Sequence, residues 1–190
     1  MGDRDDGSPG IILTNRSNKK ETFCFFENLR NGDGWAIPNF NTPNHTITLN
    51  AGAHAFVKLD PSYKGRVQRG KLIPATWAEF QLSASNDHHA HGDISVEQGN
   101  DGGATISSTE NPRVTGGFKG PITGWGKPAA WVKRSDGVMC IASTMGNWMG
   151  GPNQAAVEAQ QSIKAHTYVQ GGTGVPDVAS ANRRLAVDFY

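Results

Sequence analysis

The sequence predicts an all-β fold, an antiparallel β-sandwich with one α-helix in the C-terminal half of the chain. Three observations lead to this fold class. Short runs rich in β-branched and aromatic residues recur between clusters of Gly, Pro, Asn and Asp. The 190 residues include 24 glycines, 36% apolar residues and 18% charged residues, which is typical of a turn-rich globular chain. A single segment, near the C-terminus, has the composition and flanking breakers of a substantial helix.

The expected strands follow one another along most of the chain. They are "GIILTN", "TFCFFENL", "HTITLN", "HAFVKL", "TWAEFQL", "GDISVEQ", "GATISS", "AAWVKR" and "GVMCIAS". Residues 48–59, "TLNAGAHAFVKL", predict a β-hairpin, because Gly52 in the "NAG" turn tolerates a positive φ. The closing "RRLAVDFY" predicts a last strand, since Leu185, Val187 and Phe189 alternate with the residues between them.

Residues 153–169, "NQAAVEAQQSIKAHTYV", predict the helix, because the breaker "GGPN" precedes them and "QGG" follows them. A chain of 190 residues is long enough for one sizeable core, so we expect one domain over residues 10–190. Residues 1–9 are acidic and lack apolar periodicity, and we expect them to form a flexible N-terminus.

Charge and hydropathy limit the classes of partner. The formal net charge is +1, from 18 Lys and Arg against 17 Asp and Glu, so no basic surface for nucleic acid is expected. No apolar stretch approaches the roughly 20 residues that cross a bilayer, and the acidic N-terminus is unlike a signal peptide. The sequons at Asn15 and Asn44 nevertheless favour an extracellular location, with the cytoplasm as the alternative.

Two cysteines do not make a disulfide framework. Cys24 and Cys140 each lie in an apolar run, and the sequence leaves open whether they form one long-range bridge or stay as buried thiols. Neither lies beside a His or Lys that would activate it, which argues against a cysteine nucleophile. We expect the protein to be a monomer.

Residues 85–99, "SNDHHAHGDISVEQG", contain three of the six histidines. If a strand begins at His89, then His89, His91 and Asp93 point to the same face, because alternate side chains of a strand share a face. Two imidazoles and a carboxylate suit zinc, copper or non-haem iron, so these three residues are the predicted ligands of a divalent metal. The alternative is a polar turn whose histidines are merely solvated, since Ser, Asn and Asp favour turns.

Residues 74–82, "PATWAEFQL", and 92–99, "GDISVEQG", carry a resemblance to the thaumatin-like protein family. Members of that family have a Pro-x-Thr-Leu-Ala-Glu-Phe-Thr-Leu strand followed by an Asp-Val-Ser-Leu-Val-Asp-Gly strand. The matching residues are Thr76, Ala78, Glu79, Phe80, Leu82, Asp93, Ser95 and Gly99, with Ile94 and Val96 as conservative replacements. The resemblance covers about the first 110 residues and implies a sandwich of thaumatin-like type, although the many disulfides of the family are absent here.

The resemblance also implies an acidic cleft. In its terms Glu79 and Asp93 are the cleft carboxylates, and Arg66 or Arg69 supplies a guanidinium. Gln98 stands where the family has a further Asp, and Glu97 lies next to it.

Aromatic residues complete the predicted binding surface. Trp77 shares the face of Glu79 by strand alternation and is a candidate for stacking on a sugar ring, as is Trp35 in the loop "NGDGWAIPNF".

Two functions follow from this surface. The first is a secreted protein of defence or antagonism type that binds a glycan or a cell surface through the acidic cleft. The alternative is an enzyme that uses the same cleft. Glu79 and Asp93 would then hydrolyse a β-glucan as general acid and as nucleophile or base, or the His and Asp residues would hold a catalytic metal.

Overall fold

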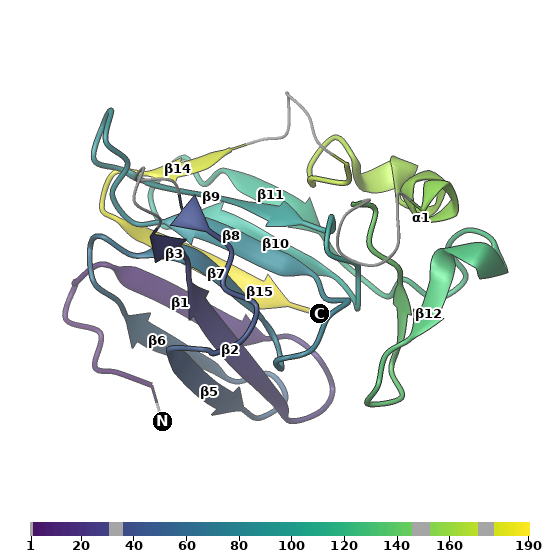
Figure 1. Cartoon of the computed structure of the whole chain (residues 1–190). Helices are drawn as coiled ribbons and strands as arrows, with labels where there is room; N and C mark the ends of the chain where they lie inside the picture. Colours follow the sequence, from purple (N-terminus) through teal and green to yellow (C-terminus); the bar gives the residue numbers. More distant parts are fainter. Residues whose placement is uncertain (1, 31–35, 146–152, 171–176) are drawn as a thin grey trace.

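The structure is a computed structural model that describes residues 2–30, 36–145, 153–170 and 177–190 (Figure 1). The strands of the first half are β1 (Gly10–Asn15), β2 (Glu21–Glu27), β3 (Leu29–Arg30), β4 (Ala36–Ile37), β5 (His45–Leu49), β6 (His54–Lys58), β7 (Lys64–Arg69), β8 (Trp77–Gln81) and β9 (Ala90–Ser95). Those of the second half are β10 (Ala104–Ser108), β11 (Thr115–Phe118), β12 (Trp131–Lys133), β13 (Met139–Ile141), β14 (Val178–Ser180) and β15 (Arg184–Phe189). The helical segments are α1 (Gln154–Ala159) and the 3-10 turns η1 (Pro128–Ala130) and η2 (Gln161–Ile163).

Two large sheets dominate this mostly β structure. One has five strands in the order β11-β10-β15-β1-β6, and the other has six in the order β14-β9-β8-β7-β2-β5. β12 pairs with β13 in a small sheet, and the segment that carries β12 and α1 lies beside the two large sheets (Figure 1). The predicted strand runs, including the closing "RRLAVDFY", all contain a strand, which confirms the sequence interpretation at the level of elements.

The two large sheets share one hydrophobic core. Leu13 and Val187 of the five-stranded sheet and Phe25 and Val67 of the six-stranded sheet are fully buried in it. The alternation of β15 explains its part in this core, since Leu185, Val187 and Phe189 are all inaccessible to solvent. The ring of Phe189 lies 5.1 Å from the ring of Phe23 in β2, so the sheets contact each other directly.

The five-stranded sheet is mixed, whereas the sequence analysis predicted an antiparallel sandwich. β1 pairs in parallel with β15, with Gly10 opposite Arg184 and Asn15 opposite Phe189. Its other neighbour, β6, is antiparallel. Alternation identifies both strands but says nothing of their direction, which depends on how distant segments meet.

The predicted hairpin over residues 48–59 is wrong. β5 pairs with β2 in the six-stranded sheet, and β6 pairs with β1 in the five-stranded sheet. The turn itself exists, because Ala53 N donates to Asn50 O and Gly52 has a φ of 71°. The chain therefore uses this turn to cross from one sheet to the other.

The predicted helix over residues 153–169 is much shorter in the structure. Asn153 caps α1 by accepting a hydrogen bond from Ala156 N, and α1 ends after six residues. Beyond η2, Tyr168 joins the six-stranded sheet instead, because its N–H donates to Ile94 O and its carbonyl accepts from Val96 N. Pairing with β9 thus overrides helix propensity in this segment. No helix in the described parts of the chain has the length and apolar character needed to span a membrane.

Residues 2–9 contact the five-stranded sheet. Asp3 forms a bridge with Phe56 of β6, and Asp6 forms an ion pair with Lys58 at 3.0 Å. Asp5 pairs with Arg184 at the start of β15.

Candidate functional site

A polar cleft of about 490 Å³ lies over β8 and β9 on the outer face of the six-stranded sheet. Glu79 and Asp93 both line it and stand directly opposite each other in the antiparallel β8–β9 register. Directly opposed residues have Cβ atoms about 4.5–5.5 Å apart, so the two carboxyl groups are immediate neighbours. The structure thus brings together the two acids that the sequence predicted. Lys64, His91 and Asp177 also line this cleft.

The carboxyl groups of the cleft are strongly perturbed. Burial, together with the charge of Glu97, raises the pKa of Glu79 to about 7, although Ser95 hydrogen-bonds its carboxylate and Arg66 lies nearby. Burial and the charges of Glu79, Asp177 and Glu97 raise the pKa of Asp93 to about 8. Asp93 Oδ1 has no hydrogen-bond partner among the described residues. Near neutral pH the pair therefore holds a proton and presents both a donor and acceptors.

Arg66 and Trp77 lie on the cleft side of the sheet, but they are buried beneath it. The Arg66 guanidinium is 3.9 Å from the Trp77 ring and 4.2 Å from the Phe26 ring. Its Nη1 donates to Asn39 O and its Nε to Gln68 Oε1. Trp77 is 3% exposed and Arg66 is 2% exposed, so neither has a free surface for a ligand. Their predicted ligand contacts are replaced by a supporting role under Glu79, whose carboxylate is attracted by Arg66.

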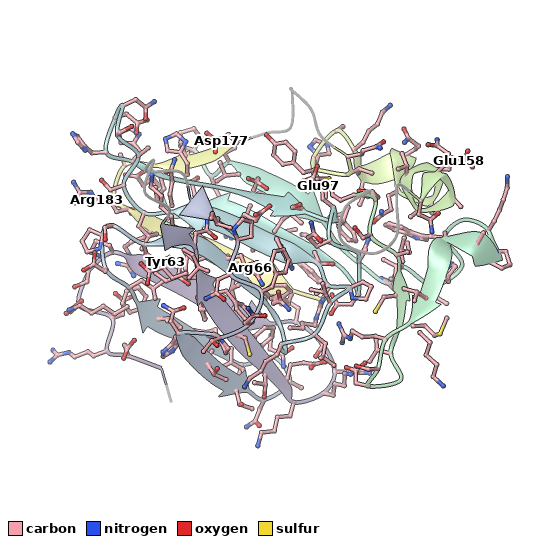
Figure 2. All side chains as sticks on the ribbon, in the orientation of Figure 1. Tyr63, Arg66, Glu97, Glu158, Asp177 and Arg183 are labelled. Atoms are coloured by element: carbon pink, nitrogen blue, oxygen red, sulfur yellow. The ribbon has the colours of Figure 1, made fainter. Side chains whose placement is uncertain are left out.

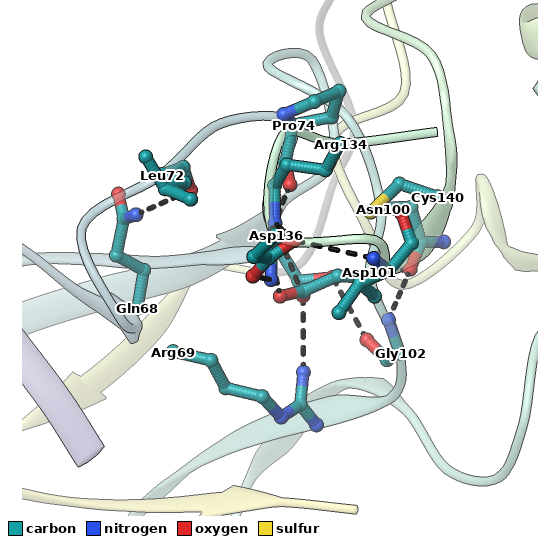
Figure 3. Close-up of polar contacts among 12 residues, drawn as sticks. Gln68, Arg69, Leu72, Pro74, Asn100, Asp101, Gly102, Arg134, Asp136 and Cys140 are labelled. Carbon is teal, nitrogen blue, oxygen red and sulfur yellow. Dashed lines mark hydrogen bonds and ion pairs between the residues drawn. The ribbon is translucent and has the colours of Figure 1, made fainter. Parts of the chain in front are cut away.

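Arg69 lies on the opposite face of β7 and cannot line the cleft. It is three positions from Arg66, and alternation places such residues on opposite faces of a strand. Its Nη1 donates to Asp101 Oδ1 at 3.1 Å (Figure 3). Its Nη2 donates to Gly103 O. Gln98, the other predicted ligand residue near β9, is buried and does not line the cleft either.

Two further residues act electrostatically on the acid pair without lining the cleft: Glu97, which the sequence analysis named, and Tyr168, which it missed. Glu97 follows β9, and Figure 2 shows it on the α1 side of Arg66, with Asp177 toward β14. Tyr168 forms a parallel bridge with Ser95. Ser95 is the register partner of Trp77 in the β8–β9 pair, and its side chain lies on the cleft side of the sheet. Burial and the charges of several carboxylates, Asp93 first, raise the pKa of the Tyr168 phenol. Tyr168 was missed because it lies within the segment predicted as helix.

The histidines meet carboxylates other than the predicted one. β9 begins at Ala90, so His89 lies in the preceding loop. There Asp87, His89 and His91 place their ligand atoms within 4.8 Å of one another. Asp93 is not part of this group. Burial lowers the pKa of His91, but hydrogen bonds with Asp177 and Asp87 outweigh it, and the net shift is upward.

The two sequon asparagines differ in their exposure to solvent. Asn15 is fully buried and its Nδ2 donates to the carbonyls of Leu49 and Asn50, so a glycan at this residue is incompatible with the folded protein. Asn44 is exposed.

Cys24 and Cys140 are both buried free thiols, and burial raises the pKa of each, that of Cys140 to about 11. Neither is an activated nucleophile.

Trp35, the second predicted stacking residue, lies outside the described residues. No known protein-family model matches the chain, and no curated protein sequence matches it either.

Proposed function

We propose that this chain is a secreted thaumatin-like protein of defence or antagonism type that binds a glycan through the cleft over β8 and β9. The observation that carries this proposal is the opposed pair Glu79 and Asp93 in a polar cleft of about 490 Å³. Such a volume accommodates a short segment of an oligosaccharide. Two carboxyl groups side by side match the adjacent hydroxyl groups of a sugar, each of which both donates and accepts hydrogen bonds.

The surroundings of the pair support a neutral ligand. Asp177 and Glu97 add negative charge beside Glu79 and Asp93, and this charge repels phosphate and other anions. Tyr168 is a partly exposed aromatic residue bridged to Ser95 of β9, two positions from Asp93. The cleft therefore offers hydrogen-bonding groups to the hydroxyls of a sugar, and Tyr168 is the candidate for stacking on its ring.

Titration calorimetry with a β-1,3-glucan hexasaccharide tests the proposal. We expect Glu79→Ala and Asp93→Ala each to weaken binding at least tenfold, because sugar hydroxyls would lose a buried hydrogen-bonding partner. Asp93→Asn, which keeps one donor and one acceptor, should weaken binding less. Glu158→Ala is the matched control, since Glu158 is an exposed acid on α1, away from the cleft (Figure 2). Unchanged affinity in both cleft variants would contradict this site.

A hydrolase remains the second candidate because of one observation. A carboxyl group with a pKa near 7, such as Glu79, beside a second acid is the arrangement of a general acid and a nucleophile or base. A reducing-sugar assay on the same glucan separates the two functions. Binding without product supports the binding protein, whereas product that disappears in Glu79→Gln would identify an enzyme. Loss of that product with a chelator would instead point to a metal-dependent catalyst.

The extracellular location has its own test. Asn44 is exposed and Asn15 is buried, so we expect native protein from the secretory route to carry one N-linked glycan, at Asn44. Mass spectrometry before and after treatment with peptide N-glycosidase measures this. An unmodified protein recovered from the cytosolic fraction would place it inside the cell.

A further inference from the structure

We propose that Asp87, His89 and His91 form a binding site for a divalent transition-metal ion of the zinc type. The site lies where the loop before β9 meets the start of that strand. It is distinct from the Glu79 and Asp93 pair, although His91 also lines the cleft. The inference does not rest on the proposed glycan-binding function.

The spacing of the three ligand atoms fits one ion. Asp87 Oδ2 lies 2.9 Å from His91 Nε2 and 3.6 Å from His89 Nδ1. Around a tetrahedral zinc, whose bonds to nitrogen and oxygen are about 2.0–2.2 Å, neighbouring ligand atoms lie about 3.3–3.6 Å apart. Small side-chain adjustments are therefore enough to admit the ion. Two imidazoles and one carboxylate are also a ligand set typical of zinc and other borderline metals.

The loop that carries these ligands is fixed by its own hydrogen bonds. Ala84 N donates to His89 O and His88 N donates to Ala84 O, each at 2.9 Å. His88 has a φ of 61°, which reverses the chain and brings His89 alongside His91. Asp87 Oδ1 accepts from His89 N at 2.9 Å, so Oδ2 is the oxygen left to face the two imidazoles. The ligands are thus held in place before an ion arrives.

Asp177 provides a second, independent observation. Its carboxylate is hydrogen-bonded to His91 Nδ1, the ring nitrogen that faces away from Asp87. Histidines that bind metals commonly donate their other N–H to a carboxylate, which fixes the tautomer and makes the ligating nitrogen more basic. In this arrangement Nε2 of His91, which is hydrogen-bonded to Asp87 Oδ2, is the nitrogen that binds the ion, and the ion replaces the proton between these two atoms. The carboxylates of Asp87 and Asp177 together balance the charge of a divalent cation.

Exposure of the ligands makes the ion exchangeable. The side chains of Asp87, His89 and His91 are 33%, 41% and 19% exposed, so solvent reaches the site. Three protein ligands leave a fourth position of a tetrahedral ion open. Because His91 and Asp177 line the cleft, that ion would lie at the β14 end of it.

Calorimetric titration of the tag-free, chelator-treated full chain with Zn²⁺ tests the proposal. We expect one ion per chain, and at least a tenfold loss of affinity in His89→Ala and in His91→Ala. Asp177→Asn removes only the outer carboxylate and should weaken binding about 10–100-fold. His54→Ala is the matched control, because His54 is exposed on β6 of the other sheet and should leave affinity unchanged.

A measurement on the unaltered protein covers the case in which a variant fails to fold. NMR spectra during Zn²⁺ addition should shift the imidazole signals of His89 and His91 and leave that of His54 in place. No binding in the unaltered protein would overturn the site. Equal affinity in His89→Ala, His91→Ala and the control would do the same, as would equal shifts of all the histidine signals.

Discussion

Asp101→Asn should lower the free energy of unfolding by about 3–5 kcal/mol, because it removes the acid from a buried network of two arginines. The Asp101 side chain is 2% exposed and accepts from Arg69 Nη1 and Arg134 Nη1, both at 3.1 Å (Figure 3). It also accepts from Thr76 N. Asn keeps the shape but loses the charge, and its amide N–H₂ faces one of the guanidinium groups. Two arginine side chains, 9% and 8% exposed, would then lack their buried counter-ion.

The network also joins parts of the fold. Arg69 belongs to β7, whereas Arg134 follows β12 of the small sheet and donates to Pro74 O at 2.8 Å. Arg69 Nη2 further donates to the main-chain oxygens of Gly103 and Tyr190. We therefore expect Asp101→Asn to loosen the β12–β13 sheet as well, which limited proteolysis would detect.

Thermal and urea unfolding measure the effect of Asp101→Asn. For a chain of this size, 3–5 kcal/mol corresponds to a fall of about 6–20 °C in the melting temperature. Asp136→Asn is the matched control, since Asp136 also pairs with Arg134 but is 39% exposed, and should cost less than about 1 kcal/mol. Similar losses of unfolding free energy in the two variants would show that the buried ion pairs of Asp101 stabilise the fold no more than the exposed pair of Asp136 does.

Glu79→Gln should stabilise the protein at pH 8 and give no gain at pH 4. The pKa of Glu79 rises from an ordinary 4.5 to about 7 on folding, chiefly through burial. The folded state thus keeps a proton that the unfolded state releases above pH 4.5. This contribution to stability is complete below pH 4.5 and is lost as the pH rises through 7. Gln never ionises, so it avoids the cost of burying a charge at high pH.

The expected gain at pH 8 is about 1–3 kcal/mol, since one pKa unit corresponds to about 1.4 kcal/mol and partial exposure reduces the effect. Melting temperatures between pH 4 and pH 9, with a chelator present, measure it. The unaltered protein should lose stability across the neutral range more steeply than Glu79→Gln. Glu158→Gln, at an exposed position on α1, should follow the unaltered protein. Parallel pH profiles for all three proteins would show that Glu79 is ionised without penalty in the fold.

The sequence predicts the strands well because alternation is a local property. It cannot assign strands to sheets, and β5 and β6 illustrate the reason. They are separated by only a short turn, yet their partners, β2 and β1, lie in different sheets. β11, with the sequence "TGGF", was not among the expected strands. A side chain at Gly117 would meet Ala104 O at 2.3 Å, so close approach to β10 explains the glycine.

The sequence could predict the part of the site that lies on two neighbouring strands. Glu79 and Asp93 lie on β8 and β9, and their sequence pattern was enough to place them together. Strand alternation also predicts that Arg69 and Arg66 lie on opposite faces of β7, a signal that the sequence analysis did not use. Tyr168, Asp177 and Asp87 come from irregular segments whose sequences have no period. Only the tertiary structure brings Asp177 into the cleft, Asp87 to His91 and Tyr168 to Ser95.

The parallel pairing of β1 with β15 has a consequence for the order of synthesis. β15 occupies the centre of the five-stranded sheet, between β10 and β1, although it follows all the other described strands in the sequence and is made after them. Until residues 184–189 emerge, β1 and β10 each keep an unpaired edge next to an apolar face, a state that favours aggregation. The nascent chain must therefore be protected until β15 has been made, because the five-stranded sheet cannot close before then.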